Sequence, residues 1–229
     1  MNTTNSLVLK CFDLQNELNT NTFNKTKGVN SKGTWITSDF NYGLAALEEL
    51  GEATKELGYH WWKKSEFNKQ KFYSELVDVF HFALSIAIQD RHYASAKDEY
   101  DSEYIKNYFL KDRNFRDEFN SIKLPIDKSI ELLCQNLFNY GVLHYLFSVC
   151  LSAGLSIDNL CIMYIGKNAL NQFRLNNGYS EGNYQYKAID NFTLDSILLE
   201  NINAYLMSDI DELKTIIYKD LSEKLLKCS

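Results

Sequence analysis

The stretch Phe72-Tyr-Ser-Glu-Leu-Val-Asp-Val-Phe-His-Phe-Ala-Leu-Ser-Ile-Ala-Ile88 decides the fold class of this 229-residue chain. Most residues of this stretch are apolar, so we expect residues 67–93 to form one long helix with little solvent-exposed face. The chain has one proline, Pro125, and ten glycines, so few residues interrupt helices. No segment shows a convincing strand pattern. We therefore predict an all-α fold, a helical bundle with no significant sheet.

The rest of the chain also reads as helices separated by polar loops. Helices are expected at residues 6–19, 39–57, 97–120, 156–175, 194–205 and 208–227, with an apolar stretch over residues 126–151 after Pro125. Residues 20–38 and 176–194 are polar and are predicted as loops. Asp39 is the expected N-cap of its helix, and Gly58 the expected stop. Neither a repeat nor a long linker is present, so residues 1–229 are predicted to form a single domain.

Two acidic pairs with i, i+3 spacing lie on successive predicted helices. Glu49 and Glu52 belong to the first helix, and Glu75 and Asp78 belong to the second. Residues three apart project from one helix face, so antiparallel packing of the two helices would bring the four carboxylates together. Carboxylates in contact repel by roughly 1 kcal/mol per pair in water and about 4 near a protein surface. Cations or protons must relieve that repulsion, and hard oxygen ligands suit Mg²⁺ or Mn²⁺.

A solvated acidic face is the alternative interpretation of these pairs. Glu48 and Glu56 lie on the same segment as the first pair, with Lys55 and Lys63 nearby. The second pair is harder to explain in this way, because apolar residues surround it and an unpaired charge is costly among them. Spacing alone leaves a metal site and an ordinary acidic face both open.

Charge and composition restrict the class of partner. The formal net charge of −6 argues against DNA, RNA or an anionic membrane as the main partner, although it is compatible with a single nucleotide. No run of about 18 apolar residues is present, so no membrane span is expected. The N-terminus shows no secretory signal. Five cysteines without a CxxC motif are expected to be reduced thiols of a cytoplasmic protein.

A third informative segment runs from Ile165 to Tyr184. Lys167, Asn171 and Arg174 lie at i, i+4 and i+7 and therefore share one helix face. Lysine and arginine supply cations for phosphate, and asparagine offers both a donor and an acceptor to one edge of a base. The alternative is a cationic helix end that complements the helix dipole, followed by an Asn-Gly turn.

Together these segments resemble the dimeric all-α dUTPases of the trypanosomatid and Campylobacter type, within the MazG-like all-α NTP pyrophosphatase superfamily. The resemblance lies in E-x-x-E from Glu49, W-W-K from Trp61, E-x-x-D-x-x-H-F from Glu75 and K-x-x-L-N-x-F-R-x-x-N-G-Y-x-x-G-x-Y from Lys167 to Tyr184. These motifs occur in family order and span most of the chain. The acidic pairs mark only the superfamily, whereas the last motif points to the dUTPase branch.

The resemblance implies a set of metal ligands and a catalytic carboxylate. The residues that match the family's Mg²⁺ ligands, which bridge the substrate phosphates, are Glu49, Glu52, Glu75 and Asp78. Mn²⁺ is a possible substitute. In the family one acidic residue of the first pair also orients the attacking water, so the catalytic candidates are Glu49 and Glu52, with Glu49 as our choice.

The resemblance also implies a substrate-binding set. Its members are Gln15, Asn19, Trp61, Trp62, His81, Lys167, Asn171, Arg174, Asn177 and Tyr179. In the family, amides of the N-terminal helix face uracil, a tryptophan forms an aromatic wall, and the lysine, arginine and tyrosine contact phosphate. Judged by residue type alone, a histidine on an apolar face is more often a core residue, and tryptophans more often pack. One departure is Tyr42, because relatives often have tryptophan there.

The activity implied by the resemblance is Mg²⁺-dependent hydrolysis of dUTP, and also of dUDP, to dUMP. Water would attack the α-phosphorus, and the enzyme would work as a homodimer, for which residues 67–93 and 126–151 offer apolar surface. A dCTPase/dUTPase or a broader MazG-like pyrophosphatase remains an alternative, because amide side chains can present either end to a base. A second alternative is a non-enzymatic helical interaction protein.

Overall fold

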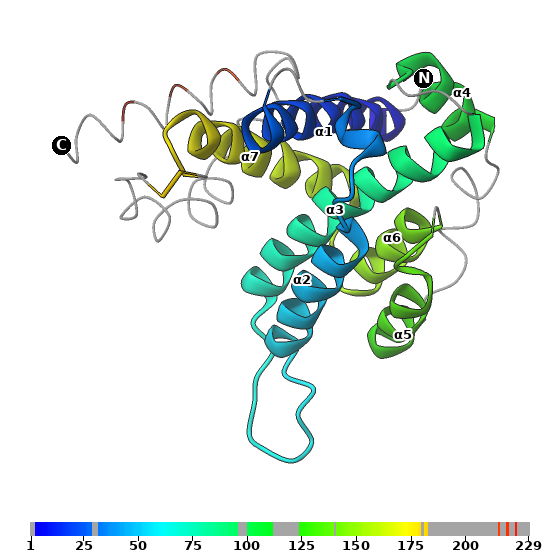
Figure 1. The fold of residues 1–229 in the computed structure, drawn as a ribbon. Helices are drawn as coiled ribbons and strands as arrows, with labels where there is room; N and C mark the ends of the chain where they lie inside the picture. Colours follow the sequence, from blue (N-terminus) through cyan, green and yellow to red (C-terminus); the bar gives the residue numbers. More distant parts are fainter. Residues whose placement is uncertain are drawn as a thin grey trace.

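The computed structural model describes residues 3–28, 32–95, 100–111, 124–139, 141–179 and 181–182, together with Thr215, Lys219 and Glu223. In these residues every regular element is a helix, which confirms the predicted all-α class (Figure 1). The elements in chain order are α1 (Thr3–Lys27), η1 (Trp35–Thr37), α2 (Tyr42–Glu56), α3 (Lys69–Ser95), α4 (Ser102–Lys111), α5 (Ile126–Asn136), α6 (Val142–Ser152) and α7 (Ile157–Asn176). The predicted helices at 194–205 and 208–227 lie almost wholly outside the described residues.

Helices α2 and α3 form an antiparallel hairpin, as the spacing of the acidic pairs required (Figure 1). The buried face of α2 repeats every three to four residues and consists of Gly43, Ala46, Leu50 and Ala53. The helix ends at Glu56, and Gly58 then adopts a positive φ of 69°, a conformation that costs glycine little. The loop that follows projects from the body of the molecule before α3 returns.

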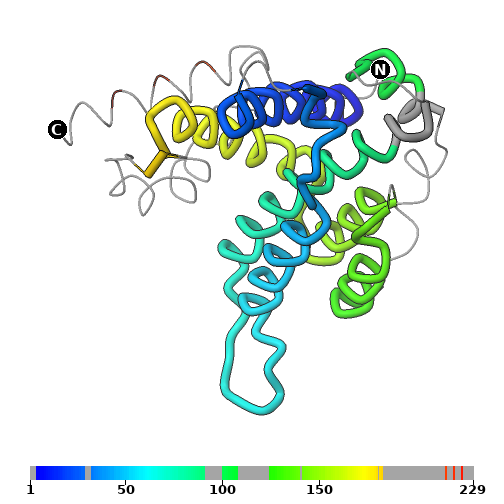
Figure 2. The backbone as a smooth tube through the Cα atoms, viewed as in Figure 1, coloured from blue at the N-terminus to red at the C-terminus, as the bar shows by residue number. Residues whose placement is uncertain are grey.

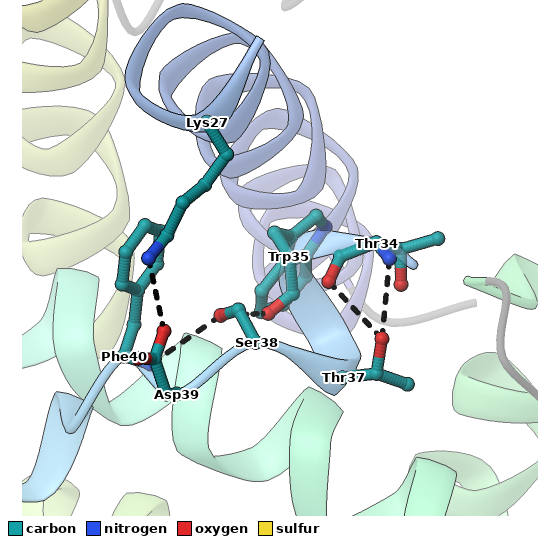
Figure 3. A network of polar contacts seen from close by, with 7 residues as sticks. All are labelled: Lys27, Thr34, Trp35, Thr37, Ser38, Asp39 and Phe40. Atoms are coloured by element: carbon teal, nitrogen blue, oxygen red, sulfur yellow. Dashed lines mark hydrogen bonds and ion pairs between the residues drawn. The ribbon is translucent and has the colours of Figure 1, made fainter. Parts of the chain in front are cut away.

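The start of α2 differs from the prediction, because Asn41 and not Asp39 is the N-cap. The side chain of Asn41 accepts a hydrogen bond from the Leu44 amide at 3.0 Å. Asp39 instead pairs with Lys27 at 3.3 Å, as Figure 3 shows. The chain is extended at Ser38, and the first helical residue is Tyr42.

Helix α1 is longer than expected, since the predicted loop over residues 20–38 begins only after Lys27. Contacts with α7 explain the extra turns. Asn21 donates to Gln172 Oε1 at 3.2 Å, and the Lys25 ammonium donates to the carbonyl of Leu175. Figure 2 shows α1 and α7 running side by side. Packing against α7 therefore overrides the weak helix propensity of this Asn- and Thr-rich stretch.

The apolar stretch over residues 126–151 contains two helices, since α5 ends at Asn136 and α6 begins at Val142. The apolar side chains of α3 and α6 are mostly buried in the core of the chain itself. Phe80, for example, packs on Phe147 and Tyr164 with ring centroids 5.8 and 5.2 Å apart. A few large apolar side chains of the two segments stay exposed, namely Phe67, Phe138 and Leu151, and their use in a dimer interface stays a prediction.

The remaining helix of the core is α7, which starts close to the predicted position. Ser156 is its N-cap and accepts from the Asn159 amide at 3.2 Å. Among the described helices, none alone is long and apolar enough to cross a bilayer; α6 and α7 reach that standard only as a pair bent by 109°. Cys11, Cys150 and Cys161 are buried free thiols.

Candidate functional site

Three glutamates converge where α2 faces α3. Carboxylate oxygens of Glu49, Glu52 and Glu75 all lie within 4.8 Å of one another, and the group could hold a metal ion. The antiparallel hairpin produces this cluster, because it sets the acidic face of α2 against that of α3. Three of the four predicted ligands are thus together.

Asp78, the fourth predicted ligand, lies beside this cluster but is engaged by a cation. Its Oδ2 accepts from the Lys167 ammonium of α7 at 2.7 Å, and both side chains are largely buried. Burial raises the pKa of Asp78, and the nearby Lys167 charge only partly offsets that effect. The contact joins α7 to the acidic hairpin.

Two carboxyl groups of the cluster have raised pKa values, which means that their charged forms are unfavourable without a cation nearby. Burial raises the pKa of Glu49 to about 7, and the charges of Asp78 and Glu75 add to the shift. Burial likewise raises the pKa of Glu75 to about 7, with contributions from Asp78 and Glu52. In the absence of a cation, these groups hold protons near neutral pH.

A cavity of about 540 Å³ adjoins the acidic hairpin. Its lining comes from α1, from the residues before and at the start of α2, from α3 and from α7. The lining residues are Gln15, Leu18, Asn19, Thr22, Phe40, Tyr42, Glu49, Asp78, His81, Phe82, Lys167, Asn171, Arg174, Leu175 and Tyr179. The lining therefore combines carboxylates and cations with amides and aromatic rings.

Most of the predicted substrate-binding residues line this cavity. Those that do are Gln15, Asn19, His81, Lys167, Asn171, Arg174 and Tyr179. Arg174 Nη1 donates to the amide oxygen of Asn171 at 3.3 Å, and the guanidinium lies 5.6 Å from the centroid of the Tyr179 ring. Asn177 does not line it: its side chain donates to the Phe173 carbonyl at the end of α7.

The two predicted tryptophans lie elsewhere in this chain. Trp61 is 89% exposed and Trp62 is 56% exposed, and both belong to the projecting loop between α2 and α3. The aromatic residues that line the cavity are Phe40, Tyr42 and Phe82. Sequence reasoning missed this role. The available signals were the tyrosine that stands where relatives have tryptophan and the phenylalanine that ends the E-x-x-D-x-x-H-F motif.

The segment before α2 delivers these aromatic rings to the cavity. The Lys27 ammonium lies 5.6 Å above the Phe40 ring while it pairs with Asp39, and Ser38 donates to the Trp35 carbonyl at 2.6 Å (Figure 3). The ring of Tyr42 then lies 6.3 Å from that of Phe40. Local contacts therefore hold the aromatic wall in place.

Buried amides on α1 meet His81 of α3 in another part of the lining. Gln15 Oε1 lies 2.9 Å from His81 Nδ1, and Gln15 Nε2 donates to Asn19 Oδ1 at 2.8 Å. Burial lowers the pKa of His81 to about 3, with a smaller contribution from Lys167, so the imidazole is neutral at neutral pH. Hydrogen-bonding groups in a fixed arrangement suit the recognition of a flat polar ligand such as a base.

Comparison with known families agrees with this geometry. A family model described as dUTPase matches residues 8–179, which include the acidic pairs and every residue that lines the cavity. A comparison with the curated proteins finds no match. The family model covers well over half of the chain. The chain therefore belongs to the all-α dUTPase family, and it is a dUTP diphosphatase, a hydrolase that acts on a phosphoanhydride bond of its nucleotide substrate.

Proposed function

We propose that the cavity binds the whole deoxyuridine nucleotide and that the enzyme converts dUTP, and also dUDP, to dUMP. The observation that supports this proposal is that groups suited to a base and groups suited to phosphates line the same cavity. Buried amides and His81 provide partners for a base, while Lys167 and Arg174 provide cations for phosphates next to the acidic cluster. With the base at the amides and His81, and the phosphates at Lys167 and Arg174, the phosphate chain would reach Glu49.

The acidic cluster fits a divalent cation, with Mg²⁺ proposed and Mn²⁺ as an alternative. Glu49, Glu52 and Glu75 offer hard oxygen ligands that lie close together, and Asp78 is adjacent. A bound divalent cation would neutralise phosphate oxygens and lower the pKa of water. Its charge would also relieve the mutual repulsion of these carboxylates.

The residues of the chain then have separate tasks. Glu49 lines the cavity, whereas Glu52 does not, so we assign the orientation of the attacking water and the acceptance of its proton to Glu49. The water oxygen forms the new bond to the α-phosphorus, and the bond to the bridging oxygen breaks. Pyrophosphate leaves from dUTP, or phosphate from dUDP. Lys167 and Arg174 offset the negative charge that develops on the leaving group.

The proposal also covers the domain organisation and the oligomeric state of the enzyme. We assign residues 1–229 to one domain and the working enzyme to a homodimer, on the basis of the family resemblance. Exposed apolar side chains of α2 are available for contact with a second copy, namely Leu44 and Leu47. Light scattering coupled to size-exclusion chromatography tests this assignment, since a mass of one chain would contradict it.

The experiment that tests the proposed function follows nucleoside monophosphate formation from dUTP, dUDP, dCTP, dTTP and UTP. Each reaction is run with Mg²⁺, with Mn²⁺ and with EDTA. Turnover of dUTP and dUDP that EDTA abolishes is the expected result. Comparable turnover of dCTP would assign the enzyme to a dCTPase/dUTPase class, and activity that persists in EDTA would contradict the metal assignment.

A further inference from the structure

A closed ring of hydrogen bonds passes through four buried residues, three of which line the cavity. Ser85 Oγ lies 3.1 Å from the carbonyl oxygen of His81, and Asn19 Nδ2 lies 2.8 Å from Ser85 Oγ. Gln15 Nε2 lies 2.8 Å from Asn19 Oδ1, and Gln15 Oε1 lies 2.9 Å from His81 Nδ1. The ring therefore starts at the backbone of His81 and ends at its imidazole.

The backbone end gives the ring its direction, because a carbonyl oxygen can only accept. Ser85 gives its single proton to the His81 carbonyl and so accepts from Asn19 Nδ2. The carboxamide oxygen of Asn19 then accepts from Gln15 Nε2. The oxygen of Gln15 faces His81 and requires a donor there, so the proton of the neutral imidazole is on Nδ1.

Tyr164 on α7 supports the same orientation of Gln15. Its hydroxyl accepts from Asn168 Nδ2 at 3.3 Å and has two acceptors for its single proton, Gln15 Oε1 at 2.8 Å and the Cys11 carbonyl at 3.2 Å. Tyr164 is fully buried and does not line the cavity. The contact with Gln15 is the shorter one, so a reversed Gln15 amide would lose this hydrogen bond and the one from His81.

The consequence is a buried acceptor without a partner, on a residue that lines the cavity. His81 is 5% exposed, and its Nε2 is buried without a hydrogen-bond partner among the described residues. With the proton on Nδ1, Nε2 carries only a lone pair. A buried acceptor of this kind is costly unless a ligand supplies a donor.

Resting on the proposed function, we propose that His81 Nε2 accepts the N3–H of uracil and that Ser85 and Tyr164 are positioning residues that select uracil over cytosine. Uracil carries a proton on N3, whereas the N3 of cytosine carries a lone pair that would face the lone pair of Nε2. A ring of the opposite direction would put a proton on Nε2 and suit cytosine instead. The direction of the ring thus decides which base the site accepts.

The tautomer of His81 is measured directly by ¹⁵N NMR of histidine-labelled, metal-free protein, with the His81 signals assigned by their loss in His81→Gln. The wild-type protein is expected to show a protonated Nδ1 and an unprotonated Nε2. Ser85→Ala removes the acceptor of Asn19 and the donor to the carbonyl, so both tautomers should then be populated. A wild-type imidazole protonated on Nε2 would overturn the proposal, and this readout does not depend on turnover.

Kinetics provide the second readout, as the ratio of kcat/KM for dUTP to kcat/KM for dCTP. Ser85→Ala and Tyr164→Phe are each expected to lower this ratio by about tenfold or more, because cytosine would then no longer face an Nε2 of His81 that is fixed as an acceptor. The controls are Ser129→Ala and Tyr73→Phe, which remove a buried serine hydroxyl and a tyrosine hydroxyl bound to the Ala153 carbonyl, both away from the cavity.

The outcomes separate this inference from the proposed function. If the wild-type enzyme hydrolyses dUTP and both variants keep the wild-type ratio while folded, the selection proposal is wrong and the proposed function stands. If the wild-type enzyme does not hydrolyse dUTP, the proposed function fails, and the NMR measurement still decides whether the ring has the stated direction. Because two variants at different positions are used, misfolding of one leaves the test intact.

Discussion

Lys167 Nζ lies 2.7 Å from Asp78 Oδ2, which connects the cationic face of α7 to the acidic hairpin of α2 and α3. A buried ion pair is costly to desolvate and is seldom justified by stability alone. Here one partner lies next to the proposed metal ligands, and both line the cavity. The pair therefore places a cation where the phosphates of a bound nucleotide would lie.

Replacement of Lys167 tests that placement. Lys167→Met removes the ammonium and should lower kcat for dUTP by about 10²–10³, the effect of losing one group that stabilises developing charge. The matched control is Lys128→Met, which removes an exposed lysine that pairs with Glu131 in α5. Steady-state kinetics provide the measurement, and similar kcat values for the two variants would contradict the assignment.

The raised carboxyl pKa values predict an unusual dependence of stability on pH. Glu75 has a pKa of about 7 in the folded protein, above its ordinary value of 4.5, so the folded state binds more protons than the unfolded state between these values. Stability contributed by this group is therefore lost as pH rises towards 7. Glu75→Gln mimics the protonated form, so in EDTA it should melt at a higher temperature than wild type at pH 8.

The same comparison at low pH completes the test. Well below pH 4.5, Glu75 is protonated in both the folded and the unfolded state, and the stability difference between wild type and Glu75→Gln should shrink towards zero. Differential scanning calorimetry across this range measures it. A difference that is constant with pH would show that Glu75 has an ordinary pKa in the metal-free protein.

The identity of the aromatic wall is a further prediction. Phe82 lines the cavity and Trp61 does not, so Phe82→Ala should raise KM for dUTP by about tenfold, because stacking on a base is worth about 1–3 kcal/mol. Trp61→Ala should leave KM nearly unchanged if the site is complete within one chain. The opposite result would mean that the projecting loop reaches a base, as the family resemblance originally suggested.

Packing of the core around Phe80 predicts a large loss of stability when this ring is removed. This ring is fully buried between Phe147 and Tyr164, and Phe80→Ala should lower the free energy of unfolding by about 3–5 kcal/mol because of the cavity left behind. Urea denaturation measures the change. A loss below about 1 kcal/mol would show that the interface between α3, α6 and α7 is less tightly packed than described.

The sequence predicted the acidic hairpin well, because its signals are local. Acidic spacing of i, i+3 on two helices with a short connection fixes which carboxylates can meet. The all-α class followed from apolar periodicity, and α7 begins one residue after the predicted start at residue 156. In the same way, most of the residues drawn from the last motif and from the N-terminal helix do line the cavity.

What the sequence did not predict depends on long-range packing. Helix α1 extends to Lys27 because its last turns contact α7, which is distant in the sequence. The N-cap is Asn41, whereas Asp39 pairs with Lys27 of α1. Likewise, residue type and spacing cannot show that Ser85 closes a hydrogen-bond ring or that Tyr164 contacts a member of it, since the partners come from three different helices.

The most direct test of the account compares turnover of dUTP by wild type, Glu75→Gln and Glu48→Gln at saturating Mg²⁺. Both variants remove one negative charge from the acidic hairpin region, but only Glu75 belongs to the carboxylate cluster, whereas Glu48 is an exposed neighbour on α2. Glu48→Gln should retain kcat within about twofold, and Glu75→Gln should lose at least about a thousandfold, since several kcal/mol of transition-state stabilisation depend on the cation. Near-normal turnover by a folded Glu75→Gln enzyme would contradict the central claim that this cluster is the catalytic metal site.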